Sequence, residues 1–147
     1  MNLHLMDMND KGMFVTILFG VLNAITHQFQ YVRAGHEIPI LFDGQGSFKR
    51  LPKANGQALG VFREIALDEQ TIELSKGNML LMCSDGITDA LNRKNVNFGF
   101  DGLVETVGQM IKPSASMVCG ELIGAVNKHQ AGSLQHDDIT VVVVRAV

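Results

Sequence analysis

Acidic side chains stand at two places where apolar segments end or begin. The apolar run LLMC ends at Ser84 and is followed by Asp85-Gly86, and Asp137-Asp138 stand just before the run ITVVVV. The two places are 137 − 85 = 52 residues apart, so only the fold can bring them together. Clustered carboxylates repel, and a divalent cation offsets that repulsion. Their hard oxygen atoms suit Mg²⁺ or Mn²⁺ better than zinc.

Each of these residues also has a structural interpretation. Asp-Gly is a common turn dipeptide, and paired aspartates often cap turns, so Asp85 and Asp137 are either metal ligands or turn residues. His36 could act as an acid or base near neutral pH, or hold a turn through hydrogen bonds. Arg33 could bind a phosphate with two guanidinium nitrogens or pair with an acid such as Glu37. Spacing alone does not decide between these alternatives.

The composition favours one packed domain. Of 147 residues, 46% are hydrophobic and 18% are charged, which suits a protein with a core. The net charge is −3 and there is no tryptophan, no basic patch and no polybasic segment, so we expect neither nucleic-acid nor membrane binding. No apolar run approaches the ~20 residues of a membrane span, and the first residues do not resemble a signal peptide. We expect a cytoplasmic protein.

The first half of the chain is typical of strands. Segments 12–23 and 27–36 are rich in β-branched and aromatic residues and are predicted to form an antiparallel hairpin. Segments 38–42 and 48–51 flank the turn signal DGQGS and are predicted to form a second pair. Segment 63–77 contains two further short strand candidates. Because these connections are too short for helical crossovers, the sheets must be largely antiparallel.

The second half mixes strands and helices. The continuous apolar run 78–84 indicates a strand buried on both faces. Apolar residues at helical spacing predict helices over 98–111 and 114–130, the second with Ser114 as N-cap. Segment 139–146, with four consecutive valines, is predicted to be a central strand. Together these elements predict an α+β domain.

Five motifs then occur in order: FVTILFGVLN, YVRAGHEIPILF, GQALG, LLMCSDGITDALN and HDDITVVVVRA. Together they resemble the metal-dependent protein phosphatases (PPM, or type 2C), in particular the bacterial SpoIIE/RsbU-like branch. The resemblance implies a β-sandwich of two antiparallel sheets flanked by helices. It also implies hydrolysis of phosphoserine or phosphothreonine in a partner protein, often an anti-sigma-factor antagonist. In the family, two Mg²⁺ or Mn²⁺ ions activate a bridging water for in-line attack on phosphorus.

The resemblance assigns roles to individual residues. Asp85 matches the aspartate of the family's DG-x-T-[ED] motif, and Asp137 matches the first aspartate of its D-[DN]-x-T motif, so both would be metal ligands. Gly86 and Asp89 belong to the first motif and would support the site. Asp138 matches a position that varies between Asp and Asn, so it too is given a supporting role, not that of a ligand.

The chain also departs from the family pattern. Arg33 stands where N-A-G-H has its asparagine, although His36 is kept as a supporting residue, and Asn78 stands where the branch commonly has Asp. No G-D-x-x-G-H-G motif is found, so residues 1–147 are expected to form a single domain that lacks the segment with the first metal-binding motif. Apolar faces at 13–22 and 139–144 would then be uncovered, which predicts possible self-association.

Two functional hypotheses therefore stand. The first is a phosphatase domain of a bacterial signalling protein, in sigma-factor regulation or a two-component pathway, that acts on a phosphorylated regulatory protein. The alternative is a degenerate, non-catalytic phosphatase fold that binds a regulatory partner protein. The matches at Asp85 and Asp137 favour the first, whereas the absent motif and the substitutions at Asn78 and Arg33 favour the second.

Overall fold

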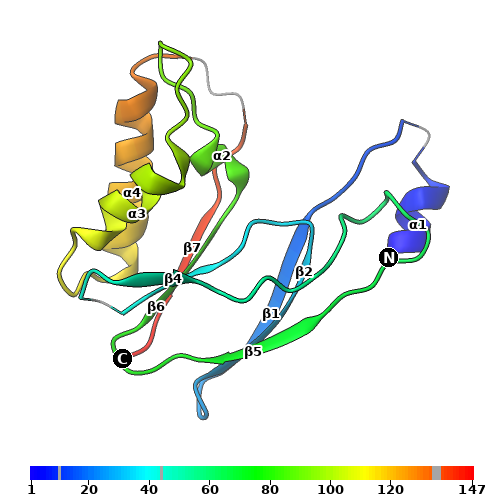
Figure 1. The fold of residues 1–147 in the computed structure, drawn as a ribbon, viewed down its shortest axis with the longest axis horizontal. Coiled ribbons are helices and arrows are strands. Elements are labelled where there is room, and N and C mark those ends of the chain that lie inside the picture. Colours follow the sequence, from blue (N-terminus) through cyan, green and yellow to red (C-terminus); the bar gives the residue numbers. More distant parts are fainter. Residues whose placement is uncertain (10, 44, 134–136) are drawn as a thin grey trace. The chain divides into compact units, whose positions relative to one another are not determined.

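The computed structural model of the chain describes all residues except 10, 44 and 134–136, and it comprises two compact units (Figure 1). Unit 1 consists of Met1–Ile38 and Pro52–Leu74. Unit 2 consists of Pro39–Leu51 and Ser75–Val147. Each unit contains one antiparallel sheet, so the predicted α+β class with antiparallel sheets is confirmed.

Unit 1 contains one short helix and a three-stranded sheet of order β1-β2-β5. Its elements are α1 (Asn2–Asp7), β1 (Ile17–Asn23), β2 (Gln28–Ala34) and β5 (Glu69–Glu73). β1 and β2 form the predicted hairpin, in register from Ile17 opposite Ala34 to Asn23 opposite Gln28. The alternation of apolar residues in β2 buries Phe29 and Tyr31, as expected for a strand. Helix α1 was not predicted.

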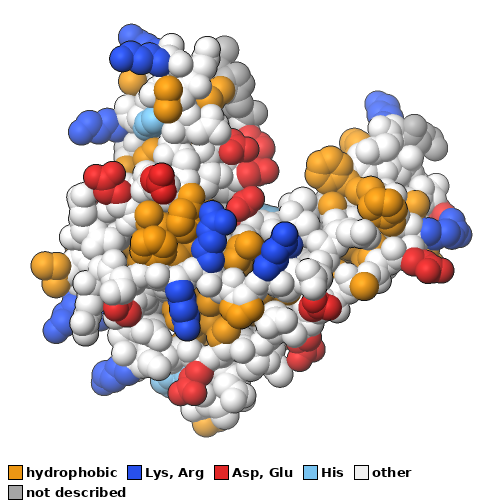
Figure 2. All heavy atoms as spheres, in the orientation of Figure 1, with side chains coloured by type: hydrophobic (Ala, Val, Ile, Leu, Met, Phe, Trp, Pro, Cys, Tyr) orange, Lys and Arg blue, Asp and Glu red, His pale blue; other side chains and the backbone are white. Residues whose placement is uncertain are grey.

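The N-terminal part of unit 1 carries exposed apolar side chains. Six large apolar side chains in segment 13–22 are 40% to 67% exposed, which confirms the expectation of uncovered apolar surface there. They are Met13, Phe14, Val15, Phe19, Val21 and Leu22. Figure 2 shows apolar side chains gathered at the surface near α1. β1 is also at one end of the described strand order, so its outer backbone edge has no strand partner among the described residues.

Unit 2 contains a four-stranded sheet of order β4-β3-β6-β7. The strands are β3 (Ile40–Phe42), β4 (Phe48–Arg50), β6 (Met79–Cys83) and β7 (Val141–Arg145). The predicted pair β3 and β4 is confirmed, and β6 lies between β3 and β7 with Leu80 and Leu81 almost fully buried. The prediction of a strand buried on both faces therefore holds for β6.

β7 was predicted to be central, and that prediction is wrong for the described sheet, where β7 stands at one end. Its valines alternate: Val141 and Val143 pack against the core, whereas Val142 is 47% exposed. A run of four valines fits a pleated, half-buried strand as well as a fully buried one, because β-branched side chains suit either face of a sheet.

Three helices complete unit 2: α2 (Asp85–Thr88), α3 (Gly99–Gly108) and α4 (Ala115–Gln130). α3 packs against α4, and α4 packs against β7 (Figure 1). The predicted N-cap is confirmed, since the Ser114 hydroxyl accepts a hydrogen bond from the Met117 N–H at 3.2 Å. One face of α4 is buried in the core, with Val118, Leu122 and Val126 no more than 1% exposed, as the helical spacing of its apolar residues indicated.

The surface over β4 is mixed in character. Figure 2 shows basic side chains lying among apolar ones there, and the Arg50 guanidinium stacks 3.9 Å from the centre of the Phe100 ring. This contact places a charge over apolar surface without burying it. Within the described residues, no helix combines the length and the apolar character that crossing a membrane requires.

Candidate metal centre

Ser84 joins the two acidic segments of unit 2. The Ser84 hydroxyl donates to the Asp138 carbonyl at 2.9 Å and accepts from the Thr140 N–H at 3.0 Å. The Ser84 N–H donates to the Thr140 carbonyl at 3.1 Å, which extends the pairing of β6 and β7 beyond the strands. One serine therefore holds the end of β6 against residues that lie more than fifty positions later in the chain.

Gly86 makes the approach of the two segments closer still. A Cβ atom at this position would lie only 2.4 Å from the Asp138 carbonyl oxygen and 3.5 Å from that of Asp137. Such contacts with backbone are too short for any side chain, so the packing requires glycine here. Gly86 thus has a packing role that the sequence alone did not reveal, and its supporting role at a metal site stays a prediction.

Asp85 opens the short helix α2, and its backbone is well held. The Asp85 carbonyl accepts hydrogen bonds from the Asp89 N–H at 2.8 Å and from the Thr88 hydroxyl at 3.2 Å. Ile87 and Ala90 are buried in the core, whereas Asp85 and Asp89 are exposed. The apolar residues therefore anchor the helix and leave both carboxylates facing solvent, where a cation can reach them.

Asp137 and Asp138 precede β7, and the Asp138 carbonyl lies beside Gly86 of α2. Both are exposed, and the Asp137 Oδ1 accepts the Asp138 N–H at 2.7 Å. The fold thus brings together the backbones of the two acidic segments at one end of the pair, as the hypothesis of a shared site requires. We refer to Ser84, Asp85, Gly86, Asp137 and Asp138 as the acidic site.

The donor atoms of the acidic site fit a hard cation. Carboxylate and carbonyl oxygens are the ligands that Mg²⁺ and Mn²⁺ prefer. Within the described part of the chain, however, no three Asp, Glu, His or Cys side chains are grouped closely enough to hold a metal ion. The assignment of Asp85 and Asp137 as ligands therefore stays a prediction from the family resemblance, and so does the supporting role of Asp89 and Asp138.

Arg33 and His36 belong to unit 1. The Arg33 side chain is only 9% exposed, and it donates from Nε to the Ala54 carbonyl at 3.2 Å and from Nη1 to the His36 carbonyl at 2.6 Å. The His36 Nδ1 lies 3.1 Å from the Thr16 hydroxyl. These contacts tie the end of β2 to neighbouring loops, as the structural interpretation of His36 expected. The hydrogen-bond partners of Arg33 are backbone carbonyls, and not the acid such as Glu37 that its structural interpretation named. The phosphate contact of Arg33 stays a prediction.

Sequence reasoning missed two further residues of this region. A Cβ at Gly56 would collide with the Arg33 carbonyl oxygen, so Gly56 allows a close backbone contact. The Tyr31 hydroxyl donates to the Pro52 carbonyl at 2.7 Å. Burial raises the pKa of this hydroxyl, and the nearby Arg33 charge offsets part of the increase. The sequence of β2 carries no signal for this partner, because the acceptor is a backbone carbonyl.

Solved structures resemble this fold. The PP2C phosphatase domain of SpoIIE from Bacillus subtilis, solved with a fragment of its regulatory domain, aligns with a TM-score of 0.75 at 21% identity, over 88% of this chain and 37% of that one. The catalytic domain of the serine/threonine protein phosphatase PstP, in complex with two manganese ions, aligns with a TM-score of 0.69 at 17% identity, over 97% of this chain and 65% of that one. At these identities the likeness concerns the fold.

Two curated relatives match most of the chain. Protein IcfG of Synechocystis sp. is 33% identical over 138 residues, and the phosphoserine phosphatase RsbU of Bacillus subtilis is 28% identical over 136 residues. Each match covers 92% of this chain, which spans 21% of IcfG and 40% of RsbU. The family model of Stage II sporulation protein E (SpoIIE) matches residues 1–147. The chain therefore belongs to the SpoIIE family, as its five motifs suggested.

Proposed function

We propose that this chain is part of a metal-dependent protein serine/threonine phosphatase domain in a bacterial signalling pathway. The observation that carries the proposal is the contact of the Ser84–Gly86 segment with Asp137 and Asp138, which brings two distant acidic segments to one end of a strand pair. The similarity to RsbU, which is named a phosphoserine phosphatase, supports the reaction. The manganese ions of the PstP structure support the choice of cation.

In this proposal Asp85 and Asp137 hold Mg²⁺ or Mn²⁺, with two ions in the intact domain. A bound ion of this kind lowers the pKa of a water ligand and stabilises the charge that develops on a phosphoryl group. Ser84 positions the two segments through its hydrogen bonds, and Gly86 permits their close approach. Neither of these two residues needs to contact substrate, so both are positioning residues.

The proposed substrate is phosphoserine or phosphothreonine in a regulatory protein of the anti-sigma-factor antagonist type. The exposure of Asp85, Asp89 and Asp137 supports a protein substrate, because a phosphorylated side chain can reach these carboxylates without entering a deep cavity. Tight binding of such a side chain would require the cation, since uncompensated carboxylates repel a phosphate.

Calorimetric titration of Mn²⁺ tests the ligand assignment. We expect Asp85→Asn and Asp137→Asn each to weaken Mn²⁺ binding at least about tenfold, because each removes a charged ligand. The matched control is Asp101→Asn, which makes the same change on an exposed residue in the first turn of α3. Binding that is indifferent to the first two variants would overturn the assignment.

Hydrolysis of p-nitrophenyl phosphate, and then of a phosphorylated regulatory protein, tests the reaction. The assays should use this chain and the longest product of its gene, with and without Mn²⁺. We expect Mn²⁺-dependent turnover that Asp85→Asn and Asp137→Asn abolish and Asp101→Asn keeps. If the longest product binds a phosphorylated partner but never turns it over, the protein is the non-catalytic binding module instead.

A further inference from the structure

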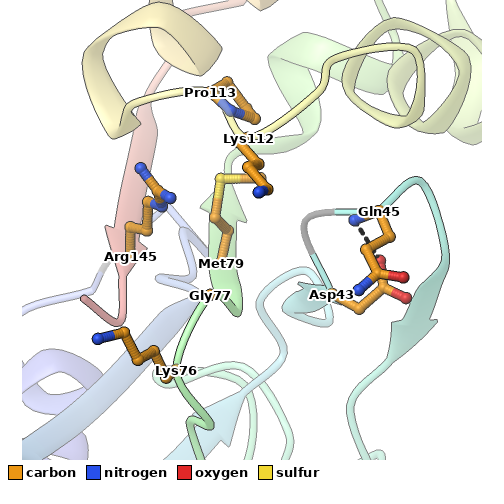
Figure 3. Close-up of a pocket in the computed structure, with 8 residues that line it drawn as sticks. All are labelled: Asp43, Gln45, Lys76, Gly77, Met79, Lys112, Pro113 and Arg145. Atoms are coloured by element: carbon orange, nitrogen blue, oxygen red, sulfur yellow. Dashed lines mark hydrogen bonds between the residues drawn. The ribbon is translucent and has the colours of Figure 1, made fainter.

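The opposite end of the β6–β7 pair carries a second group of charges. A cavity of about 190 Å³ opens there, which we call the basic cavity (Figure 3). Its lining residues are Asp43, Gln45, Lys76, Gly77, Met79, Lys112, Pro113 and Arg145. Figure 3 shows Arg145 and Lys76 on one side of Met79, and Asp43 and Gln45 on the other. This grouping could not be predicted from the sequence, because its three cations lie far apart in the chain.

Strand pairing brings Lys76 and Arg145 to the same place. Arg145 is the last residue of β7 and lies opposite Met79, the first residue of β6. The Gly77 N–H donates to the Ala146 carbonyl at 3.0 Å, so the turn that carries Lys76 is fixed beside the end of β7. Two cations are thereby held at one end of a sheet by backbone hydrogen bonds.

Lys112 is supplied by the connection between α3 and α4. Its backbone has φ of 46°, a left-handed conformation that residues other than glycine seldom adopt, and the next residue, Pro113, is buried. The lysine is therefore set by a constrained turn and is not part of a freely variable surface loop. Figure 3 shows its side chain descending from this connection toward Met79.

The basic cavity has an uncompensated positive charge. Lys76, Lys112 and Arg145 contribute three positive charges and Asp43 one negative charge, giving 3 − 1 = +2 in a chain whose net charge is −3. The Asp43 carboxylate is engaged in its own turn, where it accepts the N–H groups of Gln45 at 2.7 Å and Ser47 at 3.1 Å. Among the described residues, no hydrogen bond or ion pair engages the three cationic head groups.

We propose that the basic cavity binds a phosphate-class dianion, either free phosphate or the phosphoryl group of a phosphorylated side chain. A phosphoryl group carries a charge of about −1.5 to −2, which matches the cavity. The planar guanidinium of Arg145 can donate two parallel hydrogen bonds to such an oxyanion, while the two lysines add point charges. The volume lies below the ~300 Å³ at which sites for larger ligands begin, so one phosphoryl group fits better than a nucleotide.

This site is separate from the acidic site. Residues 79 and 83 of β6 mark its two ends, and four steps of about 3.4 Å place the cavity roughly 14 Å from the acidic site along the strand. Failure of one proposal therefore leaves the other intact. A phosphoryl group bound at this distance serves recognition or regulation, and not the chemical step.

Titration of inorganic phosphate into the 147-residue chain, freed of metal on a chelating resin, tests the proposal. Binding is followed by nuclear magnetic resonance, with chloride at matched ionic strength as the reference. We expect Lys76→Gln and Lys112→Gln each to weaken binding up to about fivefold, since both are exposed cations. Arg145→Gln should weaken it about tenfold or more, because a bidentate contact is lost. The matched control, Lys94→Gln, removes one charge outside the cavity and should change affinity less than about twofold.

A phosphoserine peptide and its unphosphorylated form distinguish the two sources of the anion. Tighter binding of the phosphopeptide than of phosphate, with competition between the two, identifies a phosphorylated side chain. Equal affinity identifies the free anion. Absence of saturable phosphate binding, or equal losses in Lys112→Gln and Lys94→Gln, overturns the proposal. Lys94 and Lys112 are both exposed, so their substitution should leave the fold intact, and circular dichroism of each variant checks this.

Discussion

β1 and β6 are both apolar strands, yet they have different surroundings. β6 lies inside a four-stranded sheet, and every residue of MLLMC except Met82 is buried. β1 stands at the end of its described sheet, and from Phe19 onward its residues are exposed. An apolar run therefore indicates that a strand can be buried, while neighbouring strands and helices decide whether it is buried.

Removal of a core side chain from unit 2 should have the largest effect. Leu122 in α4 is fully buried, and Leu122→Ala should lower the free energy of unfolding by about 2–5 kcal/mol because it leaves a cavity. The adjacent Ile123 is 40% exposed and provides the matched control, for which Ile123→Ala should cost far less. Urea unfolding followed by helical circular dichroism reports α3 and α4, and equal losses would contradict the assigned core face.

Insertion of one methyl group at the acidic site should come next. Gly86→Ala forces a Cβ against the Asp138 carbonyl and should cost about 1–3 kcal/mol in unfolding free energy, with weaker Mn²⁺ binding. Gly120→Ala is the control, because nothing lies within 4 Å of a Cβ there and alanine suits the interior of α4 better by about 1 kcal/mol. A Gly86→Ala protein as stable as the wild type would show that the two segments are not in close contact.

Local pattern predicted most of the elements, because period and turn chemistry are local properties. The β-branched and aromatic residues of segments 12–23 and 27–36 predicted the hairpin of β1 and β2, and Ser114 predicted the start of α4. The position of β7 in its sheet was missed because strand order depends on partners elsewhere in the chain.

The sequence predicts only part of the candidate site. Residue type, position next to an apolar run and the family resemblance predict Asp85 and Asp137 as metal ligands. They do not predict a role for Ser84, because that role depends on hydrogen bonds to Asp138 and Thr140, which lie 54 and 56 residues away. The hydrogen-bond partners of Arg33 could not be predicted from the sequence either, because every residue has a backbone carbonyl.

Tyr31 provides a probe of unit 1 that unit 2 lacks, since it is the chain's single tyrosine. Burial raises its pKa above the ordinary value of 10.0, so its contribution to stability is complete below about pH 10 and is lost as the pH rises through the folded-state pKa. Tyr31→Phe removes the hydrogen bond to Pro52 and should cost about 1 kcal/mol at neutral pH, but it should reduce the alkaline loss. Tyrosinate absorbance measures the pKa directly, and a value at or below 10.0 would contradict burial of the hydroxyl.

Phe19 in β1 should contribute least to folding stability. Its side chain is 62% exposed, so Phe19→Glu should change the free energy of unfolding by less than about 0.5 kcal/mol. The same substitution places a charge on an exposed apolar strand and should oppose pairing of two chains through β1. Analytical ultracentrifugation should therefore show wild-type self-association that Phe19→Glu reduces and the control Lys94→Gln does not. A wild-type chain that is monomeric at all concentrations would contradict association through β1, while a large loss of stability in Phe19→Glu would show that this side chain is buried in solution.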